Sequence, residues 1–164
     1  IPMKDSSITA KNIFGLIAWI LISLCAGLIG SQFRPGEWYK ALAKPFFTPP
    51  DFIFAPVWTL LYVLMGLAAW LVWREKGFNG ARPALLLFIG QLLLNALWSF
   101  LFFGLQSLHL SLLEIIVLWA AIFAVTILFW KETKTAGILM LPYLVWVGFA
   151  AILNLALWQM NRGF

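Results

Sequence analysis

The chain alternates between five long apolar stretches and short polar connections. The apolar stretches cover residues 12–30, 52–73, 83–103, 108–130 and 136–160. A bilayer core is about 30 Å thick, so a helix that rises 1.5 Å per residue needs about 20 apolar residues to cross it. Because backbone amides in lipid must be satisfied within their own segment, the pattern predicts five transmembrane helices. We therefore predict an all-α membrane bundle, with residues 1–164 forming a single domain.

The connection between the first two spans is the longest, and its sequence is not that of a flexible linker. Arg34-Pro35-Gly36 is a turn signal, residues 37–43 can form a short helix, and Thr48-Pro49-Pro50-Asp51 is stiff and extended. The aromatic residues of this segment could simply anchor it among lipid headgroups. We favour a second interpretation, in which the loop folds over the bundle mouth as a lid, because anchoring requires neither the proline breaks nor a helix between them.

Composition and charge narrow the function classes. Hydrophobic residues make up 63% and charged residues 10%, whereas a soluble domain carries about a quarter charged residues. A net charge of +5 does not indicate a nucleic-acid partner here, because the basic residues lie in short loops, where they orient the chain. Seven of them fall on the side of the N-terminus and four on the other, which predicts a cytoplasmic N-terminus in a plasma membrane. The two sets are Lys4, Lys11, Arg74, Lys76, Arg82, Lys131 and Lys134, against Arg34, Lys40, Lys44 and Arg162.

Conventional catalytic and metal-binding patterns are missing from the sequence. The single histidine, His109, and the single cysteine, Cys25, are too few for a metal cluster. We therefore expect no metal and no required cofactor. Glu114 is the one carboxylate within a span, and intramembrane acids are functional candidates. It lies near the third loop, so the sequence leaves open whether it reaches the membrane surface.

Amides and aromatic rings share one face of the third span. Gln91, Asn95, Trp98 and Phe102 are spaced by four, three and four residues, which places them on one side of a helix. Hydrogen bonds between helices are one interpretation of such amides, because each is costly in hydrocarbon without a partner. Two amides on an aromatic face favour the other interpretation, a cavity lined for a ligand, with Asn95 as its strongest candidate.

Tryptophan is in large excess, with ten in the chain. Trp58, Trp98 and Trp146 lie on faces that they share with polar or small residues. Flat aromatic walls suit a flat apolar ligand through stacking and large area burial. Core packing remains an alternative for each ring, but as a set the three favour a pocket.

Three separated blocks carry a resemblance to a known family. The runs WYKALAKPFFTPP with APVWTLLYVLMGLAAW, then LNALWSFLFFG, then LPYLVWVGFAAILNLALW, resemble the TspO/MBR family of tryptophan-rich sensory proteins and mitochondrial translocator proteins. The similarity runs from about Phe33 to Trp158. It implies a five-helix bundle, a homodimer, and a pocket beneath the first loop that binds porphyrins such as protoporphyrin IX, haem-pathway intermediates and, in animals, sterol-like or drug-like molecules. It also implies a bacterial cell membrane, or the mitochondrial outer membrane in a eukaryote.

The same resemblance assigns roles to individual residues. Tyr39 and Pro49 match loop residues that cover the pocket, and Trp58 and Trp146 match an aromatic pair implicated in light-dependent porphyrin breakdown. The positions that match or extend the ligand-facing surface are Trp58, Asn95, Trp98, Phe102, Trp146, Ala150 and Leu153. Phe47 stands where many relatives have tryptophan. Leu155 and Gln159 break the fifth-helix sterol motif, so cholesterol is not supported as the natural ligand.

Three functions compete at this stage. The first is a membrane receptor or carrier for a planar tetrapyrrole, which we prefer. The second is light-driven oxidative degradation of porphyrin through tryptophan radicals, with Trp58 and Trp146 as the catalytic candidates. The third is a sensory protein that acts through a partner. The dimer surface also stays open between the small-residue pairs Ala26/Gly30 and Ala120/Ala124.

Overall fold

The computed structural model describes residues 6–163, and within them every regular element is helical. The elements are α1 (Ser6–Gly30), α2 (Glu37–Ala41), α3 (Asp51–Gly80), α4 (Arg82–Ser99), the π-helix η1 (Phe100–Gly104), α5 (Leu108–Glu132) and α6 (Lys134–Met160). Five segments are long and apolar enough to cross a membrane: Thr9–Gly30, Asp51–Gly80, Arg82–Gly104, Leu108–Glu132 and Lys134–Met160. The predicted all-α bundle of five spans is therefore confirmed. Lys4, counted among the basic residues above, lies outside the described part of the chain.

The predicted spans are shorter than the helices at several ends. The largest difference is in α3, which continues to Gly80 instead of ending near residue 73. The residues that follow the apolar stretch are charged, but a helix does not have to end where it leaves the lipid. Gly77 has a φ of 68°, a left-handed conformation open to glycine at little cost, and it bends the end of α3 toward α4.

The third span does not end as a regular α-helix. Residues 100–104 form the π-helix η1, which the spacing of apolar residues did not predict. Single π-turns insert an extra residue into the helical repeat and are frequent at functional sites. This turn places Phe102 in the interior, where it is 2% exposed.

The first and third helices approach each other more closely than side chains normally allow. A Cβ atom on Gly66 would lie 2.5 Å from the Ile20 Cα, so the backbones of α1 and α3 are in contact. Ala26 and Gly30 are also buried within the bundle, whereas Ala120 is exposed on the outer face of α5. The Ala26/Gly30 pair therefore serves packing inside the bundle.

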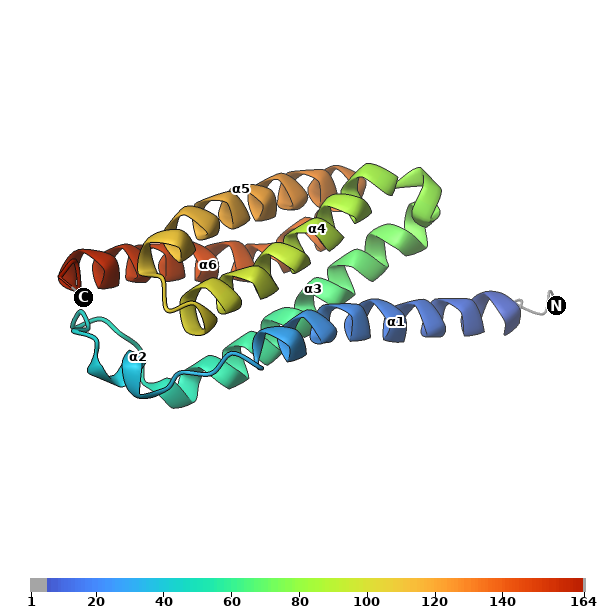
Figure 1. The fold of residues 1–164 in the computed structure, drawn as a ribbon. Coiled ribbons are helices and arrows are strands. Elements are labelled where there is room, and N and C mark those ends of the chain that lie inside the picture. Colours follow the sequence, from blue (N-terminus) through green and yellow to red (C-terminus); the bar gives the residue numbers. More distant parts are fainter. Residues whose placement is uncertain (1–5, 164) are drawn as a thin grey trace.

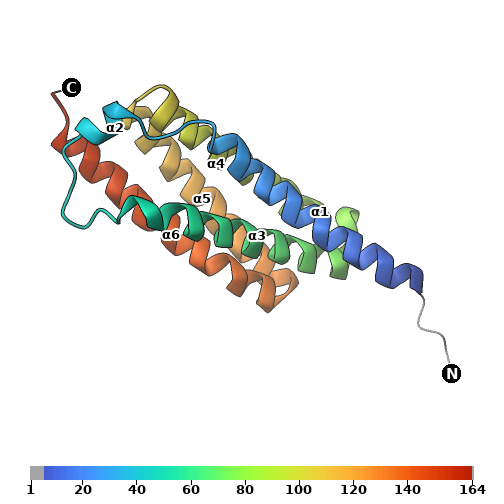
Figure 2. The same cartoon turned by 90° about the horizontal axis from the view of Figure 1, so that it is seen from below.

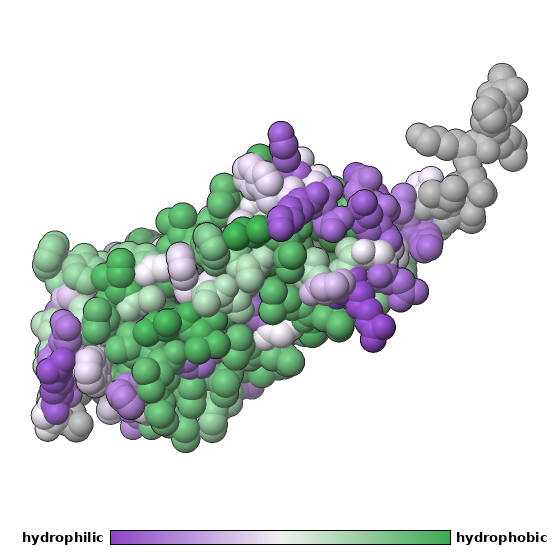
Figure 3. Space-filling view, turned by 90° about the horizontal axis from the view of Figure 1, so that it is seen from above, coloured by the Kyte–Doolittle hydropathy of each residue, from purple (hydrophilic) through white to green (hydrophobic). Residues whose placement is uncertain are grey.

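The two ends of the bundle can be told apart in Figures 1 and 2. The first loop (residues 31–50) with α2, η1 and the C-terminal end of α6 gather at one end, which we call the loop end. The start of α1 and the α3–α4 and α5–α6 connections lie at the opposite end. Figure 3 shows a largely hydrophobic body between hydrophilic ends. Exposed apolar residues on this body include Phe14, Leu93 and Val145, as expected of a surface in contact with lipid.

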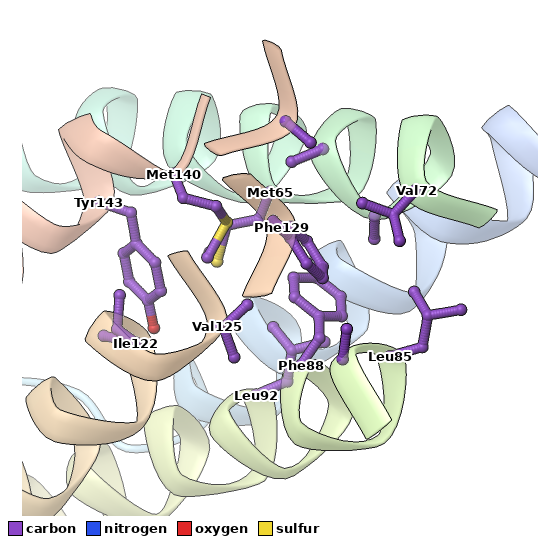
Figure 4. Packing of buried hydrophobic residues seen from close by; sticks show 14 of the residues in the cluster. Met65, Val72, Leu85, Phe88, Leu92, Ile122, Val125, Phe129, Met140 and Tyr143 are labelled. Atoms are coloured by element: carbon purple, nitrogen blue, oxygen red, sulfur yellow. The ribbon is translucent and has the colours of Figure 1, made fainter. Parts of the chain in front are cut away.

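The opposite end holds a dense apolar core, drawn in Figure 4. Phe88 and Phe129 stack there with ring centroids 5.6 Å apart. Val72, Leu85 and Met140, from α3, α4 and α6, have no exposed surface. This half of the bundle is filled by interlocking side chains.

Candidate ligand site beneath the first loop

Aromatic rings from three segments meet at the loop end. Trp98 of α4 stacks on Phe102 of η1 with centroids 4.8 Å apart, and Phe103 meets Phe102 edge-on at 4.7 Å. Tyr39 of α2 packs against Phe103 at 5.7 Å and is 7% exposed. Leu153 of α6 belongs to the same cluster. The structure thus brings together four predicted site residues, namely Tyr39, Trp98, Phe102 and Leu153.

A chain of buried hydrogen bonds lies deeper in the bundle. The Tyr62 hydroxyl donates to Asn95 Oδ1, Asn95 Nδ2 donates to the Tyr143 hydroxyl at 2.9 Å, and that hydroxyl donates to Gln91 Oε1 at 2.8 Å. These residues come from α3, α4 and α6, so the chain joins three helices. The hydrogen-bonding interpretation of the two amides is confirmed. A contact from Asn95 to a ligand stays a prediction.

A third amide, Asn154, links the aromatic cluster to the start of α5. Trp98 Nε1 donates to Asn154 Oδ1 at 3.1 Å, and Asn154 Nδ2 donates to the Leu108 carbonyl at 3.1 Å. The indole plane of Trp98 is therefore fixed by a polar contact on one edge and by Phe102 on its face. A stacking surface with a fixed orientation costs less entropy when it binds a flat molecule.

The other two predicted tryptophans lie apart from this cluster. Trp58 packs on Tyr62 at 5.7 Å and on Tyr143 at 6.2 Å, beside the hydrogen-bonded chain. Trp146 contacts Phe54 at 6.0 Å and Phe149 at 5.8 Å.

Trp146 occupies the margin of the bundle. It also lines an open apolar groove along α6, with Pro142 and Val145 among its neighbours. Its indole Nε1 is buried without a hydrogen-bond partner among the described residues. Ala150, one turn further along α6, is half-buried against the main apolar core of the bundle. Trp58 and Trp146 are therefore not in ring contact within residues 6–163, although the resemblance treats them as a pair.

The first loop is folded onto the bundle. The helix α2 ends at Ala41, two residues earlier than predicted, because Leu42 is extended with a ψ of 138°. The Lys44 ammonium donates to the Tyr39 carbonyl at 2.6 Å and lies 4.5 Å from the centre of the Tyr39 ring. Burial, together with the nearby Asp51 carboxylate, raises the pKa of the Tyr39 phenol.

The second part of the loop reaches α6. Phe47 packs edge-on against Phe149 at 6.2 Å, and Pro49 is half-buried. Phe46, by contrast, is fully exposed. Phe47 therefore makes an aromatic contact at the position where the resemblance implies a tryptophan in many relatives.

Sequence reasoning missed Tyr143 and Asn161 and left Glu114 undecided. Tyr143 precedes Val147 by four and Asn154 by eleven residues, a spacing that could have placed it inward. Asn161 follows the last apolar stretch and carries no such signal.

Glu114 is 8% exposed, and neither of its carboxylate oxygens has a hydrogen-bond partner in the described structure. It is therefore an interior side chain.

Comparison with known sequences shows the family of this chain. The sequence model of the TspO/MBR family matches residues 17–159. The chain belongs to the TspO/MBR family. Similar proteins include the tryptophan-rich protein TspO of Archaeoglobus fulgidus, which is 43% identical over 92% of this chain and 99% of its own length. The translocator protein of Homo sapiens is 37% identical over 83% of each chain. Protein CrtK of Rhodobacter capsulatus is 38% identical over 85% of this chain and 88% of its own.

Family membership and the five apolar spans together decide where this TspO/MBR protein resides. It is an integral, multi-pass membrane protein. The lipid bilayer surrounds the apolar body of the bundle. Any ligand of the loop end must therefore enter from the lipid or from the aqueous side of the first loop.

Proposed function

We propose that this protein is a membrane receptor or carrier for planar tetrapyrroles such as protoporphyrin IX and other haem-pathway intermediates. The observation that carries the proposal is the convergence of Tyr39, Trp98 and Phe102 beneath the first loop, since three elements supply rings to one place. A large flat macrocycle gains most from such a site, because stacking and burial both grow with its area. Sterol-like or drug-like apolar molecules are secondary ligands of the same surface.

Polar groups at two levels support this ligand class. Asn95, hydrogen-bonded to two phenols, retains one N–H and one lone pair beside the rings. At the rim, Arg34 is exposed and makes only a 3.4 Å contact to the Ser31 carbonyl, so its guanidinium is available to propionates. Lys44 is instead engaged with backbone carbonyls, which makes Arg34 the better candidate for that role.

The names of relatives support a receptor or sensory role. Among them are a tryptophan-rich sensory protein of Cereibacter sphaeroides, 36% identical over 80% of this chain, and the translocator proteins of mammals. A homodimer belongs to the same proposal, and light scattering of the purified protein in detergent tests it by mass.

Saturable quenching of tryptophan fluorescence by protoporphyrin IX tests the binding proposal. We expect Ala150→Leu to weaken binding, because it adds bulk at the margin of the site, and Trp146→Phe to weaken it less. Ala120→Leu is the matched control, since Ala120 is exposed on the outer face of α5. If Ala150→Leu and Trp146→Phe both keep the wild-type affinity, the assignment of Trp146 and Ala150 to the pocket is wrong.

One observation favours a second candidate function, light-dependent oxidation of bound porphyrin by dioxygen. The Trp58 ring packs on Tyr62 and Tyr143, whose hydroxyls are hydrogen-bonded. Such an arrangement can pass an electron from a phenol to an oxidised indole while the phenol proton moves to its acceptor. Loss of porphyrin absorbance under illumination, faster than in a detergent blank and slowed by Trp58→Phe, would support it. If porphyrin binds without such a loss of absorbance, only the receptor or carrier function remains.

A further inference from the structure

Asn161, at the C-terminal end of α6, joins the first loop to the rest of the bundle. Its Oδ1 accepts from the Ala43 N–H at 2.9 Å, and its Nδ2 donates to the Ala43 carbonyl at 2.9 Å. The same Nδ2 donates to the Leu157 carbonyl at 2.8 Å. The side chain is 4% exposed. One carboxamide thus satisfies both peptide groups of Ala43 while it is fixed to α6.

No other hydrogen bond in the described residues connects the first loop to a distant part of the chain. The remaining side-chain hydrogen bonds of residues 31–50 are local: Ser31 and Gln32 to Leu28, Arg34 to Ser31, Lys40 to Glu37, Thr48 to Pro45, and Lys44 to carbonyls of residues 39–42. Ala43 and Asn161 are 118 positions apart. We call the two hydrogen bonds between Asn161 and Ala43 the clamp. Apart from the clamp, the loop is held to the bundle by apolar and ring contacts.

The clamp acts on a segment that is already stiff. Lys44 donates to three carbonyls at the end of α2, so residues 37–44 form one hydrogen-bonded unit. Tyr39 and Leu42 of this unit are buried against the aromatic cluster. Lifting the unit would expose their apolar surface and would also break both bonds at Ala43. Among the described residues, the side chain at position 161 is therefore the one polar tie between α6 and the segment that packs on Phe102 and Phe103.

We propose that Asn161 is a positioning residue that holds the first loop closed over the ligand site and sets the rate at which ligand exchanges. The closed position of the loop follows from the geometry alone, whereas the effect on ligand exchange rests on the proposed tetrapyrrole function. The physical reason is that a carboxamide reproduces the donor and acceptor of a peptide group, so it pairs with Ala43 as a neighbouring strand would. An apolar side chain at position 161 removes both bonds to Ala43, and because Ala43 is exposed, water can take their place without holding the loop to α6.

Hydrogen–deuterium exchange of the ligand-free protein tests the clamp itself. In Asn161→Ala, amide exchange in residues 37–50 should accelerate about 10- to 100-fold, the effect of losing two hydrogen bonds. Gln159→Ala is the matched control, since Gln159 is exposed, and it should exchange as wild type. Asn161→Asp keeps the acceptor and loses both donations, so it should also accelerate exchange and serves if the alanine variant does not fold. Unchanged exchange in the folded variants overturns the proposal.

Stopped-flow quenching with protoporphyrin IX then tests the consequence for ligand. Asn161→Ala should raise the association and dissociation rates together by about tenfold, with a smaller change in Kd. Faster amide exchange with unchanged ligand rates would overturn the role in ligand exchange while leaving the clamp intact. If the wild-type protein does not bind protoporphyrin IX at all, the proposed function fails, and the exchange experiment still decides the clamp.

Discussion

The two ends of the bundle differ in how their interiors are filled. At the opposite end, Phe88, Phe129 and Met140 have no exposed surface and pack against one another. At the loop end, rings also gather, but Trp98 keeps part of its surface exposed, and the cover is the first loop with its short helix α2. The comparison teaches that the opposite end is a closed apolar core, whereas the loop end keeps partly exposed rings beneath the first loop, and the proposed ligand site rests on this difference.

A polar layer separates the two regions. The hydrogen-bonded chain of Tyr62, Asn95, Tyr143 and Gln91 crosses the interior at intermediate depth. Buried polar groups in lipid require partners, and each of these side chains finds one in another. The layer therefore fixes the relative positions of α3, α4 and α6 and gives the candidate site a polar floor.

The largest expected effect comes from a cavity in the packed end. Phe88→Ala should destabilise the protein by about 3–5 kcal/mol, since Phe88 is fully buried between Trp19 and Phe129. Thermal unfolding in detergent measures the change. Below its unfolding temperature the variant should bind protoporphyrin IX as wild type does. If Phe88→Ala lost binding but little stability, the packed end would take part in ligand binding, and the account of the two ends would be wrong.

Breaking the polar layer should cost less. Asn95→Ala removes the acceptor of Tyr62 and the donor to Tyr143, and we expect a loss of about 1–2 kcal/mol because interhelical bonds in membranes are individually weak. Tyr62→Phe, which removes one bond of the same chain, should cost about half as much in the same unfolding experiment. Equal stability of wild type and Asn95→Ala would exclude the layer as a structural element.

The sequence predicted the architecture and the inward faces well. Five spans follow from length and composition, and the inward side of α4 follows from the spacing of Gln91, Asn95 and Trp98. The π-turn η1 could not be predicted, because it depends on how the end of α4 packs against the loop. The clamp at Asn161 brings together residues 118 positions apart, which periodicity within one helix does not report. Trp146 was placed with the other tryptophans by pattern, whereas the structure places it at the bundle margin.

A smaller loss of stability is expected at the aromatic cluster. Trp98→Phe keeps a ring against Phe102 but removes the bond to Asn154, so unfolding should require about 1 kcal/mol less free energy. The same thermal experiment measures it. A loss as large as that of Phe88→Ala would mean that the loop end is as tightly packed as the opposite end.

The smallest expected effect is a gain in stability. Glu114 is buried with both oxygens unpartnered, and a buried carboxyl without partners costs free energy. Glu114→Leu should therefore stabilise the fold by up to about 1 kcal/mol. Clear destabilisation of this variant would instead assign the carboxyl a binding partner in the working protein.

Paired titrations of Trp98→Phe and Trp19→Phe with protoporphyrin IX test the central claim most directly. Both tryptophans lie inside the bundle, but Trp98 belongs to the loop-end cluster and Trp19 packs on Phe88. The account predicts that Trp98→Phe weakens binding about three- to tenfold, while Trp19→Phe leaves Kd unchanged. Equal affinities for both variants, or a loss confined to Trp19→Phe, would contradict a tetrapyrrole site beneath the first loop.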